Sequence, residues 1–99
     1  MILITGSILA RAETFDALRE AGIEHSRRSR SEPGCIAHNL HVDCENPLRL
    51  VFVEKWQDRA AVATHFKVKA SIDFVVVARK LGAAPPSMDI LDTTPVQMG

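Results

Sequence analysis

The sequence predicts an α+β fold, in which helices cover one face of a single four-stranded antiparallel sheet. The 99-residue chain has the size of one domain, and its composition, 46% hydrophobic and 24% charged, is that of an ordinary globular protein. Segments with strand-like alternation and helix-like periodicity follow one another in the order β-α-β-β-α-α-β. We therefore expect one domain over residues 1–99, with a core of about 1–92 and a C-terminal tail of 93–99.

The first strand and the first helix occupy the N-terminal third. Residues 1–10 are rich in Ile and Leu, which predicts a strand with apolar side chains on both faces. Residues 12–30 change to helical spacing, and Pro33 and Gly34 end this helix. The helical spacing is carried by Phe15, Leu18, Gly22, Ser26 and Ser29.

Two strands joined by a turn follow. Residues 43–47 have turn chemistry, so the alternating segments 35–42 and 48–56 should pair as an antiparallel hairpin. One face of the first segment carries Ile36, His38, Leu40 and Val42. One face of the second carries Phe52, Glu54 and Trp56.

Two helices and a last strand complete the pattern. Asp58 is a plausible N-cap for a short helix over 59–66, and Ser71 for a longer helix that ends at Leu81. Residues 87–93 form a weaker strand pattern. This order fits a ferredoxin-like α+β fold.

The second face of the predicted sheet is also apolar. Left in water, it would expose more apolar area than monomers usually tolerate, so we expect a homodimer that joins sheet to sheet. This face carries Leu3, Leu9, Ala37, Val51 and Val53.

Charge and hydropathy exclude several partners. Twelve Lys and Arg balance twelve Asp and Glu, and no basic stretch is interleaved with aromatic residues, so neither nucleic acid nor a membrane surface is expected as a partner. The longest apolar run, 74–78, is far too short to span a membrane, which favours a cytoplasmic protein. Arg27, Arg28 and Arg30 are expected on the solvated face of a helix end.

The candidate site residues lie on the predicted hairpin and the short helix. Glu54 and Trp56 share one face, and a buried Glu54 would need a partner, for which His65 is the obvious candidate. A Glu54–His65 contact is either structural or the support of a catalytic base. His38 is either a core residue or a second candidate base.

The commoner catalytic motifs are not found. The sequence contains no recognisable Ser-His-Asp arrangement, metal-binding HxxxH helix or glycine-rich phosphate loop. Cys35 and Cys44 lie about 30 Å apart along an extended hairpin strand and its turn, too far for a disulfide, and lack zinc-site spacing. We therefore expect activity without metal, flavin or haem.

Four short motifs resemble the antibiotic biosynthesis monooxygenase domain family. In order they are Glu32-Pro33-Gly34-Cys35, Glu54-Lys55-Trp56, Asp58-Arg59-Ala60-Ala61 and His65-Phe66. The resemblance runs from the first strand to about residue 92 and implies a dimeric α/β barrel made of two ferredoxin-like subunits. The family includes cofactor-free oxygenases of polyphenols and quinols, haem-degrading oxygenases, a sugar-phosphate isomerase and many proteins without an assigned reaction.

The sequence departs from two of the family's catalytic patterns. Phe52 stands where the quinol-oxidising members have an Asn that holds the substrate. The haem degraders have a Trp at the place of His65 and a His at that of Val75, so haem is disfavoured.

The resemblance implies a cofactor-independent monooxygenase that acts on a small phenolic or quinol-like molecule. His38 or His65 would remove a phenolic proton, Glu54 would orient the imidazole, and the electron-rich anion would react with O₂. Trp56, with Phe52 and Leu40 on the same faces of the hairpin, would contact the substrate. Two alternatives remain open: an acid/base isomerase or lyase that uses the same residues, and a ligand-binding protein without catalysis.

Overall fold

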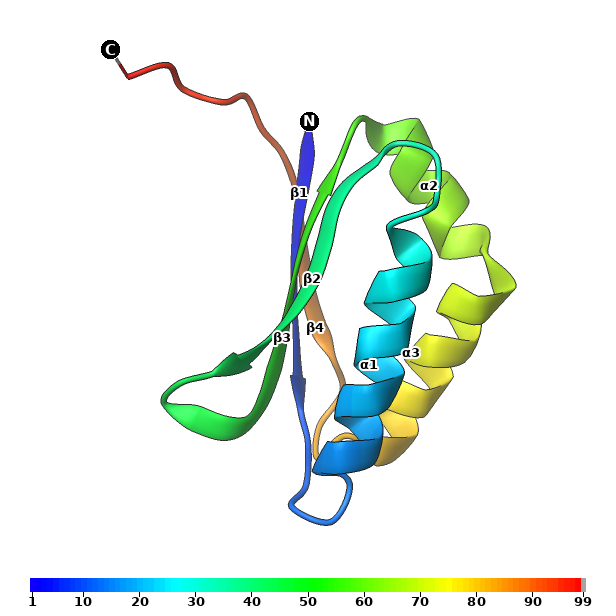
Figure 1. The fold of residues 1–99 in the computed structure, drawn as a ribbon, viewed down its shortest axis with the longest axis vertical. Helices are drawn as coiled ribbons and strands as arrows, with labels where there is room; N and C mark the ends of the chain where they lie inside the picture. Colours follow the sequence, from blue (N-terminus) through cyan, green and yellow to red (C-terminus); the bar gives the residue numbers. More distant parts are fainter. Residues whose placement is uncertain (99) are drawn as a thin grey trace.

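The computed structural model describes residues 1–98, and its elements follow the predicted order (Figure 1). The strands are β1 (Ile2–Leu9), β2 (Cys35–Asp43), β3 (Asn46–Trp56) and β4 (Ser87–Asp92). The helices are α1 (Phe15–Ser29), α2 (Arg59–Lys67) and α3 (Lys69–Leu81). The predicted α+β architecture is therefore confirmed.

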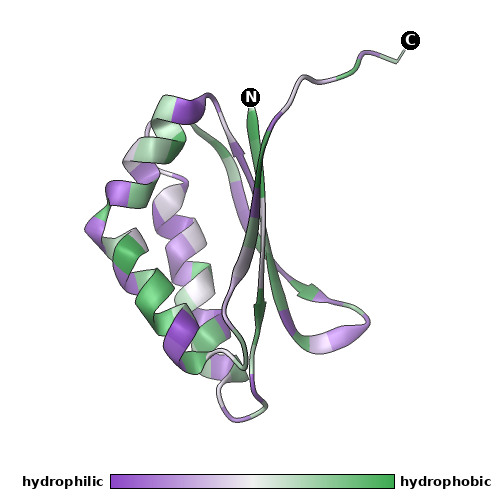
Figure 2. Ribbon diagram, turned by 180° about the vertical axis from the view of Figure 1, so that it is seen from behind, coloured by the Kyte–Doolittle hydropathy of each residue, from purple (hydrophilic) through white to green (hydrophobic). Residues whose placement is uncertain are grey.

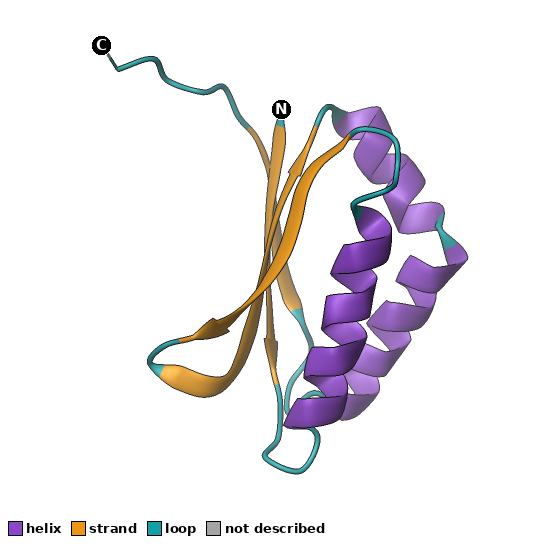
Figure 3. Cartoon of the chain, viewed as in Figure 1, coloured by secondary structure: helices purple, strands orange, loops and turns teal. Residues whose placement is uncertain are grey.

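The structure has two layers. The strands form one antiparallel sheet in the order β2-β3-β1-β4, and all three helices lie against the same face of it (Figure 3). The turn between β2 and β3 extends away from the helical layer (Figure 1). Among the described residues, no helix is long and apolar enough to cross a membrane.

A β-bulge at Ile36 changes the predicted parity at the start of β2. Cys35 pairs with Trp56 and Ala37 pairs with Lys55, so Ile36 has no partner of its own on β3. Cys35 consequently packs with Trp56 on the helical side, while Ile36 is 58% exposed. The prediction that Ile36 shares a face with His38 was wrong for this reason.

The two predicted helix caps have different outcomes. Asp58 is confirmed as the N-cap of α2, because its Oδ1 accepts a hydrogen bond of 2.9 Å from the Ala61 backbone N–H. Ser71 is not a cap: α3 already begins at Lys69, directly after the extended residue Val68. Ser71 lies inside the first turn of α3, where its buried side chain faces α1 and accepts a hydrogen bond of 3.4 Å from Arg28.

The core between the layers consists of two apolar clusters separated by buried polar side chains. Along β3, Phe52 belongs to one cluster and Trp56 to the other, while Glu54 stands between them. The polar residues buried with Glu54 are His25, Ser26, Ser29, His38, His65 and Ser71. A core interrupted in this way indicates a functional site rather than packing alone.

The second sheet face is only partly covered in the single chain. The residues predicted on it, Leu3, Leu9, Ala37, Val51 and Val53, are all of intermediate burial. Figure 2 shows hydrophobic residues along much of β1, which runs through the middle of the sheet. The edge strand β4 is exposed throughout, and its Leu91 pairs with Leu3 on this face at 48% exposure.

Candidate functional site

A cavity of about 240 Å³ lies between α3 and the sheet. Its polar lining includes two histidines and a carboxylate, which come from α1, α2 and β3: His25, His65 and Glu54. Its apolar lining includes Ile8, Phe52, Phe66, Phe74, Val75 and Met88. The cavity therefore combines a mostly apolar wall with a few convergent polar groups, which is typical of small-molecule sites.

His65 is oriented by a carboxylate that the chain delivers from the end of α1. Its Nδ1 lies 2.8 Å from Glu32 Oε1, and the Trp56 ring packs against it with the ring centres 4.5 Å apart. An ionised carboxylate only accepts hydrogen bonds, so Nδ1 of His65 carries the proton and Nε2 keeps its lone pair. Gly34, which has a positive φ of 83°, brings Glu32 into this position because it permits the sharp turn into β2.

His25 has the opposite arrangement. Its Nδ1 lies 2.8 Å from Arg28 Nη2, and a guanidinium only donates, so neutral His25 carries its proton on Nε2. Burial, followed by the charges of His38, His65 and Arg28, lowers the pKa of His25 to about 3. His25 is therefore a neutral hydrogen-bond donor near neutral pH. Its ring stacks on Phe74, with the ring centres 4.4 Å apart.

His38 and Glu54 form a buried pair at the cavity wall, in which Glu54 lines the cavity and His38 lies behind it. His38 Nδ1 lies 2.8 Å from Ser26 Oγ, and its Nε2 lies 3.3 Å from Glu54 Oε1. The second contact is close enough for an ion pair but is not aligned as a hydrogen bond. Glu54 Oε1 also accepts a hydrogen bond of 2.9 Å from the Trp56 indole N–H. Burial by itself would raise the pKa of Glu54, but His38 and the Trp56 indole outweigh it and lower that pKa.

The structure separates the six predicted site residues into two groups. His65, Glu54 and Phe52 line the cavity. His38, Trp56 and Leu40 do not line it.

Packing explains why the second group lies outside the cavity. His38 and Trp56 are fully buried, and Trp56 belongs to the apolar cluster around Ile2 and Ile4. Leu40 packs against α1 at Gly22, where even a Cβ would lie only 2.8 Å from the Leu40 side chain.

The predicted contact between Glu54 and His65 is replaced by two other pairs. His65 binds Glu32, and Glu54 contacts His38 and Trp56. The turn after α1 therefore brings Glu32, rather than Glu54, into hydrogen-bonding contact with His65.

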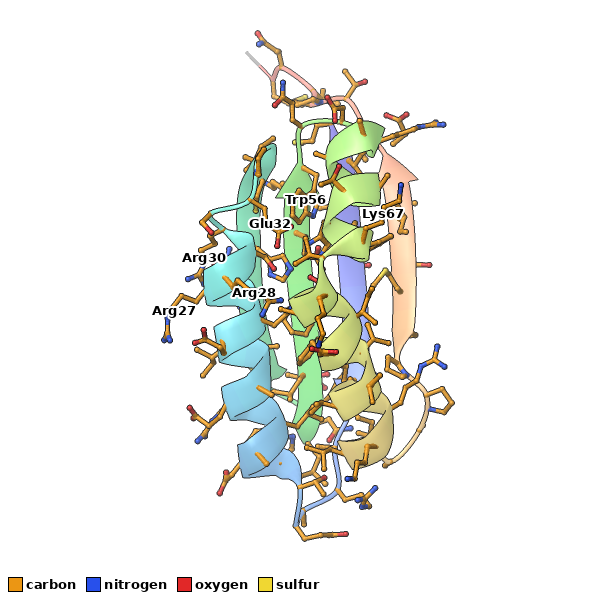
Figure 4. All side chains as sticks on the ribbon, turned by 90° about the vertical axis from the view of Figure 1, so that its right-hand side faces the viewer. Arg27, Arg28, Arg30, Glu32, Trp56 and Lys67 are labelled. Atoms are coloured by element: carbon orange, nitrogen blue, oxygen red, sulfur yellow. The ribbon has the colours of Figure 1, made fainter. Side chains whose placement is uncertain are left out.

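Sequence reasoning missed His25 and assigned Arg28 to solvent. His25 follows Gly22 by three positions, so the helical spacing places it on the buried face of α1, and that spacing could have identified it. Arg28 is half-buried and donates to His25 and Ser71, so the prediction that it forms part of a solvated face was wrong. Figure 4 shows Arg27 at the outer side of α1 and Arg28 toward α3.

Three of the four histidines form a cluster that could be taken for a metal site. One ring nitrogen of each of His25, His38 and His65 lies within 4.8 Å of one from each of the others. Three nitrogens around a tetrahedral metal, each at about 2.0–2.1 Å, would lie about 3.4 Å apart, which this limit allows. Arg28, however, leaves His25 without a lone pair on Nε2. In this arrangement the cluster therefore offers a metal the lone pairs of at most two histidines.

Comparisons with known proteins agree with this fold. A protein of Synechocystis sp., sll1783, itself uncharacterised, is 35% identical over 92 residues; these cover 90% of this chain and 60% of that protein. The chain thus spans about three-fifths of the length of this relative. A solved antibiotic biosynthesis monooxygenase is 26% identical with a TM-score of 0.87, over 96% of this chain and 100% of that one.

Two further comparisons establish the fold and the family. A protein from Deinococcus radiodurans superposes with a TM-score of 0.93 at 21% identity, covering 100% of both chains. The sequence profile of the antibiotic biosynthesis monooxygenase family matches residues 1–76. Because this match covers well over half of the chain, the protein belongs to the antibiotic biosynthesis monooxygenase family.

Proposed function

We propose that this protein is a cofactor-independent monooxygenase that acts on a small aromatic substrate carrying a hydroxyl group. The observation that carries the proposal is the position of His65, which lines an apolar cavity while its Nδ1 is held by Glu32. This arrangement leaves Nε2 as a base for a hydroxyl proton, on an imidazole that is itself buried at 3% exposure. The cavity volume also suits such a substrate: about 150 Å³ suffices for benzene, so about 240 Å³ accommodates one or two rings.

The reaction would begin with proton transfer from the substrate hydroxyl to His65 Nε2. The negative charge of Glu32 would stabilise the imidazolium that forms. The phenolate would transfer one electron to O₂, and the resulting pair of radicals would join at a ring carbon as a peroxide. Loss of water from this peroxide leaves a quinone carbonyl. One oxygen atom of O₂ stays on the ring and the other leaves as water, together with the ring hydrogen and the hydroxyl proton.

The site residues divide this work between contact and support. Phe52 and Phe74 line the cavity and would contact the faces and edges of the ring. His38 and Trp56 would support the site from behind the cavity wall, because both contact Glu54, which lines the cavity, and Trp56 packs on His65. Of the two predicted bases, only His65 lines the cavity, so it takes this role in the proposal.

A second candidate function is acid/base isomerisation without oxygen. It is favoured by one observation, the pair of opposite tautomers in the cavity lining. His25 presents an N–H donor and His65 an accepting nitrogen. Such a pair can donate a hydrogen bond to one oxygen while it removes a proton elsewhere.

The assembly we propose is a homodimer. The partly exposed apolar residues on the second sheet face, including Val51 and Val53, would be covered by the same face of another copy. The cavity lies on the opposite, helical side of the sheet, so this assembly leaves it accessible.

Oxygen uptake with a panel of quinols and phenols tests the function. His65→Gln should remain folded and lower the rate by roughly 10² to 10⁴. His41→Gln is the matched control, because His41 is exposed on β2 and does not line the cavity. An unchanged rate in folded His65→Gln would refute the role of His65. If the wild type consumed no oxygen with any substrate but isomerised a hydroxycarbonyl compound, the second function would replace the first.

A further inference from the structure

We propose that the cavity selects substrates with two oxygens on adjacent carbons of a planar ring, which His25 and His65 hold through one donated and one accepted hydrogen bond. This inference rests on the proposed function and narrows its substrate class to 1,2-dihydroxyaromatic compounds. It also gives His25 and Arg28 defined roles: His25 contacts the substrate, and Arg28 positions the proton on His25.

The two histidines offer complementary hydrogen-bonding groups. Arg28 donates to Nδ1 of His25, so the proton of His25 is on Nε2. Glu32 accepts from Nδ1 of His65, so Nε2 of His65 has a lone pair. Both Nδ1 atoms are occupied, so the Nε2 atoms remain for a ligand. Within residues 1–98, neither Nε2 has a hydrogen-bond partner. Both nitrogens are accessible to solvent, because neither is one of the fully buried atoms that lack a partner.

The spacing of the two rings suits oxygens that are close together. One ring nitrogen of His25 and one of His65 lie within 4.8 Å of each other. A hydrogen bond spans about 2.8 Å, so two bonds that converge on a ligand from nitrogens no more than 4.8 Å apart favour two oxygens that lie close together, as they do on neighbouring carbons. In a 1,4-diol the oxygens lie at opposite ends of the ring, so converging bonds from this pair favour it less than a 1,2-diol.

Each hydroxyl then has a definite partner. One hydroxyl donates its proton to His65 Nε2, which is the proton that the proposed reaction removes. The oxygen of the second hydroxyl accepts from His25 Nε2–H. The ring lies in the apolar part of the cavity, where Phe52 and Phe74 contact each other and both contact the His25 ring.

Arg28 is placed to keep His25 in this state. Its guanidinium is held between His25 Nδ1 and Ser71 Oγ, at 2.8 Å and 3.4 Å respectively, and its Nε is buried without a partner. Burial is the main cause that disfavours a second proton on His25, and the positive charge of Arg28 adds to it. His25 therefore remains a neutral donor while His65 cycles between its neutral and protonated forms.

Binding of the three dihydroxybenzene isomers without oxygen tests the selectivity independently of turnover. Under anaerobic conditions, titration calorimetry should show that catechol binds about tenfold more tightly than resorcinol or hydroquinone, because its two oxygens are the closest together and are best placed to meet both histidines at once. His25→Phe should abolish this preference, and His41→Gln should keep it. Equal affinity for the three isomers, or tighter binding of hydroquinone, would overturn the inference.

The tautomers can be measured directly, without any ligand. In ¹⁵N-labelled protein, NMR should show that neutral His25 carries its proton on Nε2 and neutral His65 carries its proton on Nδ1. Arg28→Met should release His25 from the single tautomer. A wild-type His25 with its proton on Nδ1 would overturn the inference, even if Arg28→Met failed to fold.

The two measurements separate this inference from the proposed function. Tighter binding of catechol without oxygen uptake on any diol would support the inference and refute the monooxygenase. Oxygen uptake that did not depend on the positions of the hydroxyls, together with equal binding of the isomers, would support the monooxygenase and refute the inference.

Discussion

Acidification should destabilise the fold through His25. In the unfolded chain His25 takes up a proton at its ordinary pKa of 6.5, but in the folded protein its pKa is about 3. Between these values the unfolded chain binds a proton that the folded protein does not, so the free energy of unfolding falls as the pH decreases. Each pH unit in this range corresponds to about 1.4 kcal/mol. Lowering the pH from 7 to 5 should therefore cost about 2 kcal/mol.

Urea unfolding at fixed protein concentration measures this effect. The wild type and His41→Gln should both lose about 2 kcal/mol between pH 7 and 5, whereas His25→Gln should lose much less. Glu54 should not contribute to the change between pH 7 and 5. The stability that comes from its lowered pKa is lost only as the pH falls through and below the ordinary value of 4.5. An equal loss in His25→Gln and in the wild type would show that His25 is not buried as a neutral group.

Three further predictions concern other parts of the molecule. Sedimentation should show that the wild type is a dimer and that Val53→Asp loses both association and stable folding. A compact wild-type monomer, or a native-like monomer of Val53→Asp, would contradict the proposed dimer face. Glu32→Gln should lower kcat by about tenfold to hundredfold, because an amide can still orient His65 but cannot stabilise its charged form. An unchanged kcat in the folded variant would show that the charge of Glu32 does not assist the proton transfer. Arg28→Met should bind Co²⁺ or Zn²⁺ more tightly than the wild type, because His25 can then present a lone pair to the metal. Visible absorption of the Co²⁺ form measures this binding. Equally tight binding by the wild type would contradict the tautomer assigned to His25.

The sequence was sufficient to predict the order of the elements and the α2 cap, because both depend on local patterns. Alternation with a period of two and spacing of three to four residues reflect which side chains face the core. Asp58 sits immediately before its helix and bonds to a backbone group three residues later. The bulge at Ile36 has no such local signal, since the alternation continues smoothly through it and only the pairing with β3 reveals the extra residue.

The site was harder to predict because its contacts connect distant segments. Glu54 and Trp56 could be placed on one face from strand periodicity, and their hydrogen bond follows from that. The choice between Glu32 and Glu54 as the partner of His65 depends on the turn at Gly34 and on how α2 lies across the sheet. His25 has a sequence signal in its helical position, but its chemistry follows only from the contact with Arg28.

The polar residues between the two apolar clusters are the strongest argument that this core does more than hold the fold together. In a chain of 99 residues, apolar side chains at positions 38 and 54 would join the two clusters, and replacing buried ionisable partners with packed hydrophobic groups is often neutral or stabilising. The fold instead retains a network in which one oxygen of Glu54 meets both His38 and Trp56. The network holds Trp56, whose ring packs against His65. A core that is less stable than an apolar one is therefore explained if the orientation of the His65 imidazole matters for function.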